Sequence, residues 1–264
     1  LLYTASIYAF VITGIFILPD TPLNLFWLLS FWMATKYFKS ENPKNIHLLL
    51  VGLFTGLAAL SKYTGVFIWV GIGLYIIIFD RKQLKNPFLY LSMLLTVICC
   101  IPILYWNMEN NFISFTFHGE RVSLFGKPNF GTFGTELAGE FFYNNPVIFV
   151  LIVMSIILTF KKKTSLNKDM QRLIICTAFP LIGLFIFFSF TRPTLPHWNA
   201  PAYNLLILLA AAWLSDKYEQ KENHFIVPKS IAASLAVMTI VVIFGAIEIK
   251  TGIVPLSPYT EPDK

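Results

Sequence analysis

The strongest constraint on this chain is a series of nine apolar runs, each about 17 residues long, that are separated by short polar segments. An α-helix needs about 20 mostly apolar residues to cross the hydrocarbon core of a bilayer. Charged residues make up only 13% of the 264 residues, whereas soluble proteins carry about 25%. The sequence therefore predicts an all-α integral membrane protein, a single transmembrane domain over residues 1–264 built as a multi-span bundle of about nine helices.

The positions of Lys and Arg between these runs predict the orientation. The expected spans are Leu2–Leu18, Leu23–Phe38, Ile46–Leu60, Thr64–Phe79, Phe88–Leu104, Pro146–Phe160, Leu173–Phe190, Ala200–Leu214 and Ile231–Ile247. If Leu1 lies on the cytoplasmic side and each run crosses once, the cytoplasmic loops hold 14 of the 20 Lys and Arg residues. Cytoplasmic loops of membrane proteins are rich in these residues. The net charge of +6 is thus explained by basic residues in the short loops between spans. The predicted partner is the lipid bilayer, and no nucleic-acid partner is predicted.

Two charged residues in tight turns on the predicted outer face are the first candidates for chemistry. Asp20 lies in "ILPDTPLNLFW" after the first run, and Lys62 lies in "LAALSKYTGVF" between two runs. A charge at membrane depth is costly and is a functional candidate for that reason, and Lys commonly binds phosphate. Two alternatives stay open: Asp20 could cap the helix that starts near Thr21, and Lys62 could extend to the membrane interface.

A long outer segment over 107–145 is predicted to be amphipathic and to lie along the membrane, because its aromatic residues alternate with polar ones. Its candidates for substrate binding are His118, Glu120 and Arg121. His118 and Glu120 supply two metal ligands without a third. No metal site is therefore predicted, a divalent cation has no support from a ligand cluster, and no cofactor is evident.

The segment "TRPTLPHWN" adds Arg192, His197 and Trp198 at the outer ends of two runs. Arg suits a bidentate contact with phosphate, and Trp suits the membrane interface or stacking against a sugar. Together the outer pieces gather an acid, three cations and several aromatic residues on one face. This chemistry is expected where an anionic, lipid-linked substrate docks.

Four blocks of the chain resemble a known family. They are "LPDTPLNLFWLLSFWMATKYF", "GLFTGLAALSKYTGVFI", "PILYWNMENNFISFTFHGERV" and "LPHWNAPAYNLLILLAAAWL". They resemble family-39-type membrane glycosyltransferases, which are similar to dolichyl-phosphate-mannose protein mannosyltransferases and to the bacterial aminoarabinose transferases that modify lipid A. The resemblance extends to about Leu214. The Pro-Asp-x-Pro-Leu and Ser-Lys-Tyr blocks, in this order and spacing, are its most specific part.

This resemblance implies a GT-C fold in the bacterial inner membrane, with the active site facing the periplasm. It also implies transfer of a sugar from a polyprenyl-phosphate donor, with inversion, to a lipid, glycan or protein acceptor. In the family, an acidic residue in the first outer loop, upstream of the span that starts here at Leu2, is usually regarded as the main catalytic residue. Because Leu1 already lies inside an apolar run, we expect this chain to be a segment of a longer protein that lacks that loop and the N-terminal span. The segment alone is not expected to be a complete enzyme.

We therefore predict a glycosyltransferase whose acceptor hydroxyl attacks C1 of the donor sugar. The predicted catalytic residue is Asp20, and the predicted substrate-binding residues are Lys62, Arg121, Arg192, His118, Glu120, His197 and Trp198. The alternative is a transporter or flippase of a lipid-linked glycan, which would also need cations at the membrane boundary. A flippase needs polar residues along its spans, and the interiors of these runs are nearly free of charge.

Overall fold

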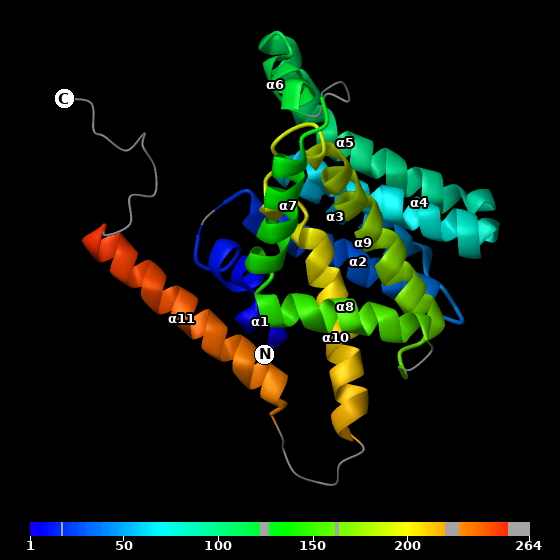
Figure 1. The fold of residues 1–264 in the computed structure, drawn as a ribbon. Coiled ribbons are helices and arrows are strands. Elements are labelled where there is room, and N and C mark those ends of the chain that lie inside the picture. Colours follow the sequence, from blue (N-terminus) through cyan, green and yellow to red (C-terminus); the bar gives the residue numbers. More distant parts are fainter. Residues whose placement is uncertain (17, 122–126, 162–163, 220–226, 253–264) are drawn as a thin grey trace.

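The computed structural model describes residues 1–16, 18–121, 127–161, 164–219 and 227–252, and all regular structure in these residues is helical (Figure 1). This confirms the all-α prediction. The elements are α1 (Leu2–Ala5), the π-helix η1 (Ile7–Ile12), α2 (Asp20–Phe38), α3 (Asn45–Ser61), η2 (Tyr63–Val66), α4 (Phe67–Phe79), η3 (Arg81–Lys85), α5 (Pro87–Glu109), α6 (Ile113–Arg121), α7 (Phe130–Tyr143), α8 (Pro146–Phe160), α9 (Lys168–Ser189), η4 (Pro196–Trp198), α10 (Ala200–Glu219) and α11 (Lys229–Thr251). The elements η2, η3 and η4 are short 3-10 helices.

Three helices in the described residues, α5, α9 and α11, are long and apolar enough to cross a membrane. The pair α7 and α8 adds a fourth candidate if the two helices, bent by 98°, form one broken span, and α3 and the η2–α4 segment are apolar but shorter. The chain is thus a multi-pass membrane protein, whereas the count of nine spans stays a prediction. The predicted run from Phe88 to Leu104 corresponds to α5, which continues to Glu109.

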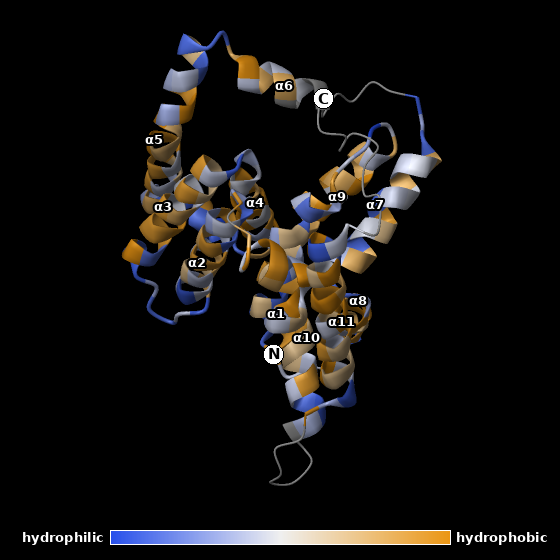
Figure 2. Ribbon diagram, turned by 90° about the vertical axis from the view of Figure 1, so that its left-hand side faces the viewer, coloured by the Kyte–Doolittle hydropathy of each residue, from blue (hydrophilic) through white to orange (hydrophobic). Residues whose placement is uncertain are grey.

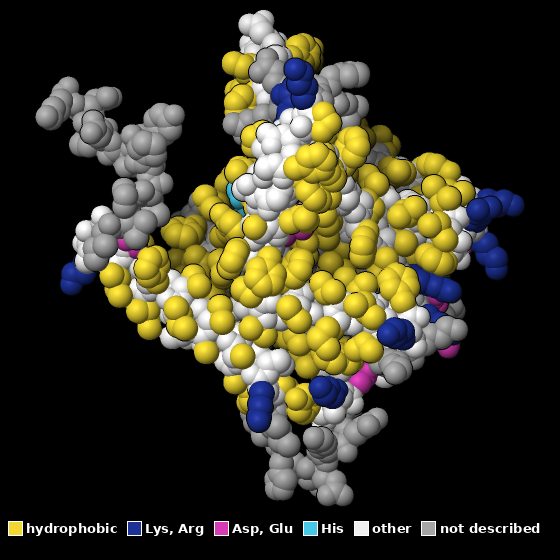
Figure 3. All heavy atoms as spheres, viewed as in Figure 1, with side chains coloured by type: hydrophobic (Ala, Val, Ile, Leu, Met, Phe, Trp, Pro, Cys, Tyr) yellow, Lys and Arg dark blue, Asp and Glu magenta, His cyan; other side chains and the backbone are white. Residues whose placement is uncertain are grey.

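The surface agrees with a membrane environment. Hydrophobic side chains cover most of the face in Figure 3, over α7, α8 and α11, and the Lys and Arg side chains stand near its edges. Only 17% of the most apolar window of α5 and of α11 is buried inside the protein, against 56% for α9. Figure 2 shows hydrophilic residues at the end of α5 next to α6 and at the opposite ends of α2 and α10. The exposed apolar sides of α5 and α11 are therefore suited to contact lipid.

The predicted span Leu2–Leu18 is wrong as a continuous α-helix. Helix α1 ends at Ala5, Ser6 is extended, and the π-helix η1 ends at Ile12. Two side chains replace the backbone bond that would join Ala5 to Ala9. The Asn145 side chain donates to the Ala5 carbonyl over 2.9 Å, and the Ser6 hydroxyl accepts from the Ala9 amide over 3.3 Å. A π-helix within an otherwise apolar run often marks a functional site.

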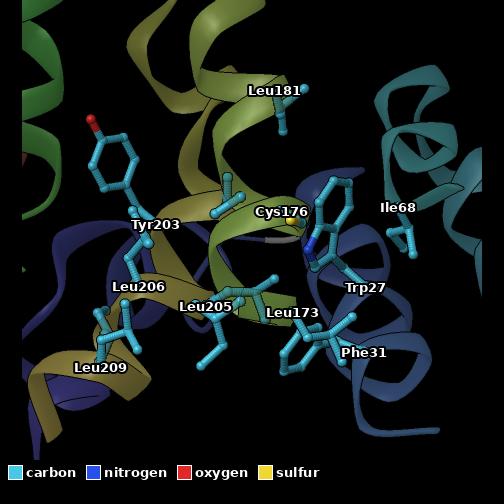
Figure 4. Packing of buried hydrophobic residues seen from close by; sticks show 14 of the residues in the cluster. Trp27, Phe31, Ile68, Leu173, Cys176, Leu181, Tyr203, Leu205, Leu206 and Leu209 are labelled. Atoms are coloured by element: carbon cyan, nitrogen blue, oxygen red, sulfur yellow. The ribbon is translucent and has the colours of Figure 1, made fainter. Parts of the chain in front are cut away.

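The hydrophobic core joins α2, α4, α9 and α10 (Figure 4). Trp27 of α2, Ile68 of α4 and Leu181 of α9 are fully buried. Helices α4 and α9 approach closely at Gly71, where an added Cβ would lie 2.3 Å from the Thr177 Cα atom. Close packing of this kind is typical of membrane helices, which use small residues to bring backbones together.

Candidate functional site

A cavity of about 950 Å³ opens where the ends of α3, α5 and α9 meet the start of α2 and the η4 turn. These ends belong to the face that the sequence predicts to be the outer one. The walls are mainly apolar and aromatic, with Trp106 from α5, Phe185 from α9 and Trp198 from η4 among them. The charged part of the wall is formed by Asp20 and Lys62. The structure thus brings together three of the residues predicted for the site.

Asp20 and Lys62 form an ion pair on the cavity wall. The Lys62 Nζ atom lies 3.0 Å from Asp20 Oδ1 and 3.1 Å from Oδ2. The side chain of Asp20 is 6% exposed and that of Lys62 is 23% exposed. The two groups therefore interact with little screening by water, and Lys62 is the more exposed partner of the two.

The break between α3 and η2 places Lys62 at this position. Helix α3 ends at Ser61, and Lys62 has an extended backbone, with φ −161° and ψ 137°. The following turn then folds back on α3 at Gly65, where an added Cβ would lie 2.4 Å from the Ala58 carbonyl carbon and the Ala59 amide nitrogen. The glycine of the "SKYTG" turn is thus required by close backbone contact.

Asp20 is not a conventional helix cap. The cap position of α2 is Pro19, without a side-chain cap bond. Within the described residues, the Asp20 carboxylate accepts hydrogen bonds from Lys62 and from the Tyr8 hydroxyl, at 3.3 Å, and from no amide of α2. Because Tyr8 is fully buried and lies in η1, the π-helix supplies a partner of Asp20. Sequence reasoning missed Tyr8, since the first run was predicted to be a regular helix.

His197 and Trp198 lie in η4 beside this pair. The ring of Trp198 is 5.1 Å from that of Phe185, and the ring of His197 is 6.2 Å from that of Tyr143, measured between centroids. Burial, and then the positive charge of Lys62, lower the pKa of His197, while the charge of Asp20 acts in the opposite direction. His197 is therefore favoured in its neutral form.

The other predicted residues are placed less directly. Arg192 follows α9 and is half-buried, and it is not among the residues that line the cavity described above. His118, Glu120 and Arg121 belong to the backbone of α6, but their side chains lie outside the described part. Their roles in substrate binding stay predictions. The beginning of α6 contacts two residues that line the cavity, Tyr63 and Asn107. The Ser114 hydroxyl shares a hydrogen bond of 2.8 Å with the Tyr63 hydroxyl and donates one of 2.5 Å to the Asn107 side-chain oxygen.

Thr64 and two glutamates of α7 lie near the site and were not among the predicted site residues. Thr64 lines the cavity, and its hydroxyl is buried and has no hydrogen-bond partner within the described residues. On α7, Glu136 and Glu140 are 1% exposed and bond to residues around η4. These glutamates could not be recognised from the sequence, because their partners are about 60 residues away in the chain. Among the described side chains, no group of three or more His, Cys, Asp and Glu residues could hold a metal ion.

Comparison with known proteins supports the resemblance in the first part of the chain. Residues 1–106 match a family described as dolichyl-phosphate-mannose-protein mannosyltransferase. Over these residues the resemblance is confirmed, and the match includes the Asp20 and Lys62 turns. No curated protein and no solved structure matches the chain. The resemblance after residue 106 stays a prediction.

Proposed function

We propose that this protein is a glycosyltransferase that moves a sugar from a polyprenyl-phosphate donor to an acceptor hydroxyl, with inversion. The observation that carries the proposal is the Lys62–Asp20 pair in the wall of a large apolar cavity. A lipid phosphate needs a cation for its head and apolar surface for its chain, and the cavity supplies both. The family match over residues 1–106 points to the same class of donor. We place the site on the periplasmic face of the bacterial inner membrane.

Lys62 has the role of holding the donor phosphate and offsetting its charge as the bond from C1 to the phosphate oxygen breaks. Trp198 lies on the same cavity wall and adds an aromatic surface. Arg121 and Arg192 are proposed as further contacts to phosphate, and His118, Glu120 and His197 as polar contacts to substrate. The aromatic wall is suited to the first isoprene units of the carrier.

Asp20 is proposed to act as the base or orienting group for the acceptor hydroxyl. In the ion pair, both of its oxygens are engaged by Lys62. When the donor phosphate competes for Lys62, the carboxylate oxygens are released from this cation and can accept a hydrogen bond from the acceptor hydroxyl. The acceptor oxygen then attacks C1, its proton passes to a carboxylate, and polyprenyl phosphate leaves.

The proposal is tested with the full-length protein reconstituted into proteoliposomes with a polyprenyl-phosphate sugar labelled in both the lipid and the sugar. A transferase releases polyprenyl phosphate and moves the sugar label to an acceptor. A transporter or flippase instead moves the intact donor across the bilayer. Transport of intact donor without release of polyprenyl phosphate would contradict the proposed function.

A further inference from the structure

The η4 turn, which carries Trp198, is held at both ends by one side chain of α7. Glu136 Oε2 accepts a hydrogen bond from the Thr194 hydroxyl over 2.8 Å, and Oε1 accepts one from the Asn199 side-chain amide over 3.2 Å. Thr194 precedes η4 and Asn199 follows it. All three residues are buried. A single carboxylate therefore joins the two ends of the turn.

A second carboxylate, one helical turn further along α7, strengthens this connection. Glu140 accepts hydrogen bonds from the Asn199 side-chain amide and, over 2.6 Å, from the Tyr203 hydroxyl at the start of α10. Buried polar groups in a low-dielectric setting give strong and specific hydrogen bonds when they are satisfied. The position of η4 is thus set by buried polar contacts as well as by packing.

Gly139, between the two glutamates, allows η4 to lie directly on α7. An added Cβ at Gly139 would lie 2.0 Å from Pro196 Cγ and 2.7 Å from Pro196 Cβ. The proline ring is rigid, so η4 would have to move to make room. On the same helix, an added Cβ at Gly134 meets nothing within 4 Å. The chain thus offers two glycines that differ in whether they contact η4.

We propose that Glu136 and Gly139 are positioning residues that hold η4 so that Trp198 and Leu195 complete the wall of the donor site. Both of these η4-region residues line the cavity that contains Lys62. The inference rests on the proposed function, since it concerns binding of the polyprenyl-phosphate donor. It assigns α7 to the architecture of this site, although α7 itself supplies none of the cavity-lining residues described above.

The test compares Gly139→Ala with Gly134→Ala in the purified full-length protein. The probe is undecaprenyl phosphate, and the readout is its apparent Kd, measured from the ligand-induced rise in the unfolding temperature. We expect Gly134→Ala to bind as the wild type does. Gly139→Ala should bind about tenfold more weakly, which corresponds to ~1.4 kcal/mol of binding free energy. Adding Pro196→Gly to Gly139→Ala should recover part of this affinity, because it removes the ring that clashes.

A pair of variants at Glu136 tests the positioning role without adding atoms between α7 and Pro196, as Gly139→Ala does. Glu136→Leu removes both acceptors and should weaken binding as Gly139→Ala does. Glu136→Gln should retain most of the affinity, because its oxygen accepts from Asn199 while the Thr194 hydroxyl can accept from its NH₂ group. A merely structural role would lower the unfolding temperature without ligand and leave the apparent Kd unchanged.

The outcomes separate the two proposals. Binding by the wild type together with equal Kd values for Gly139→Ala and Gly134→Ala, or for Glu136→Leu and the wild type, overturns the positioning role and leaves the proposed function intact. An absence of binding by the wild type contradicts the proposed function, and the positioning role is rejected with it.

Discussion

At Asp20, a carboxylate is held by one cation and one hydroxyl at the edge of an apolar cavity. Lys62 engages both oxygens, and Tyr8 adds a bond to Oδ1. In the proposed function, Asp20 can accept the proton of the acceptor hydroxyl only after another anion has taken its place beside Lys62. The donor phosphate is the anion that the proposed reaction supplies. In the proposed function, binding of the donor and the availability of Asp20 to the acceptor are therefore coupled through Lys62.

The role of Asp20 is tested by Asp20→Asn in the full-length protein. Asn keeps the size and polarity of the side chain but cannot accept the acceptor's proton, so we expect normal insertion and a loss of about 10²–10⁴-fold in transfer rate. The matched control is Asp169→Asn, which removes one partner of an exposed pair with Arg172 and should leave the rate unchanged. Transfer by Asp20→Asn at a near-normal rate would remove Asp20 from the chemistry.

Part of the site could be predicted at the level of single residues. The sequence predicts that Asp20 and Lys62 share one face, because both are charged residues in tight turns on the same predicted side, and the ion pair shows that they are in direct contact. Tyr8 could not be predicted, because its approach to Asp20 depends on a break in the first run. That break involves Asn145, which is 140 residues away from Ala5 in the chain. A local pattern carries no information on such a partner.

At the scale of helices, the apolar runs after Leu23 identify the helices well, but they do not show where helices touch. The close contact between α4 and α9 depends on Gly71, while Gly73 on the same helix has no atom within 4 Å of an added Cβ. Apolar character alone does not distinguish these two glycines. In the same way, Glu136 and Glu140 resemble surface residues of an amphipathic segment until η4 is placed beside them.

The packing of α4 on α9 is tested by Gly71→Ala and Gly73→Ala. The Gly71→Ala methyl group would overlap the backbone at Thr177, and overpacking of this kind costs about 1–3 kcal/mol. Gly73→Ala should be neutral or stabilising by up to about 1 kcal/mol, since Ala is the better helix former. Thermal unfolding in detergent provides the measurement. Equal unfolding temperatures for the two variants would contradict the close contact.

For the whole molecule, the positions of Lys and Arg in the sequence and the helix ends that surround the cavity indicate the same face of the protein. The cavity collects the ends of α3, α5 and α9 and the start of α2, which the Lys and Arg count assigns to one side. The orientation of that side toward the periplasm stays a prediction, because it depends on the number of crossings. Helix length and hydropathy alone identify three or four spans in the described residues.

The orientation is tested by labelling single cysteines in cells whose outer membrane has been permeabilised. Cys99, Cys100 and Cys176 are first replaced by Ser. An impermeant maleimide should then label Thr116→Cys on α6 and leave Ser40→Cys unlabelled until the inner membrane is opened; both native residues are exposed. The reverse pattern would place the cavity on the cytoplasmic side.

The most direct test of the central claim is the rate at which the reconstituted full-length protein releases polyprenyl phosphate from its sugar-linked donor. The account predicts that the double variant Asp20→Asn/Lys62→Gln inserts normally and loses nearly all release. Because this variant removes both charges, its loss cannot be attributed to an unpaired buried carboxylate. Lys85→Ala, at the predicted cytoplasmic end, serves as the control and should match the wild type. Release by the double variant at the wild-type rate would contradict the claim that this ion pair is the centre of the donor site.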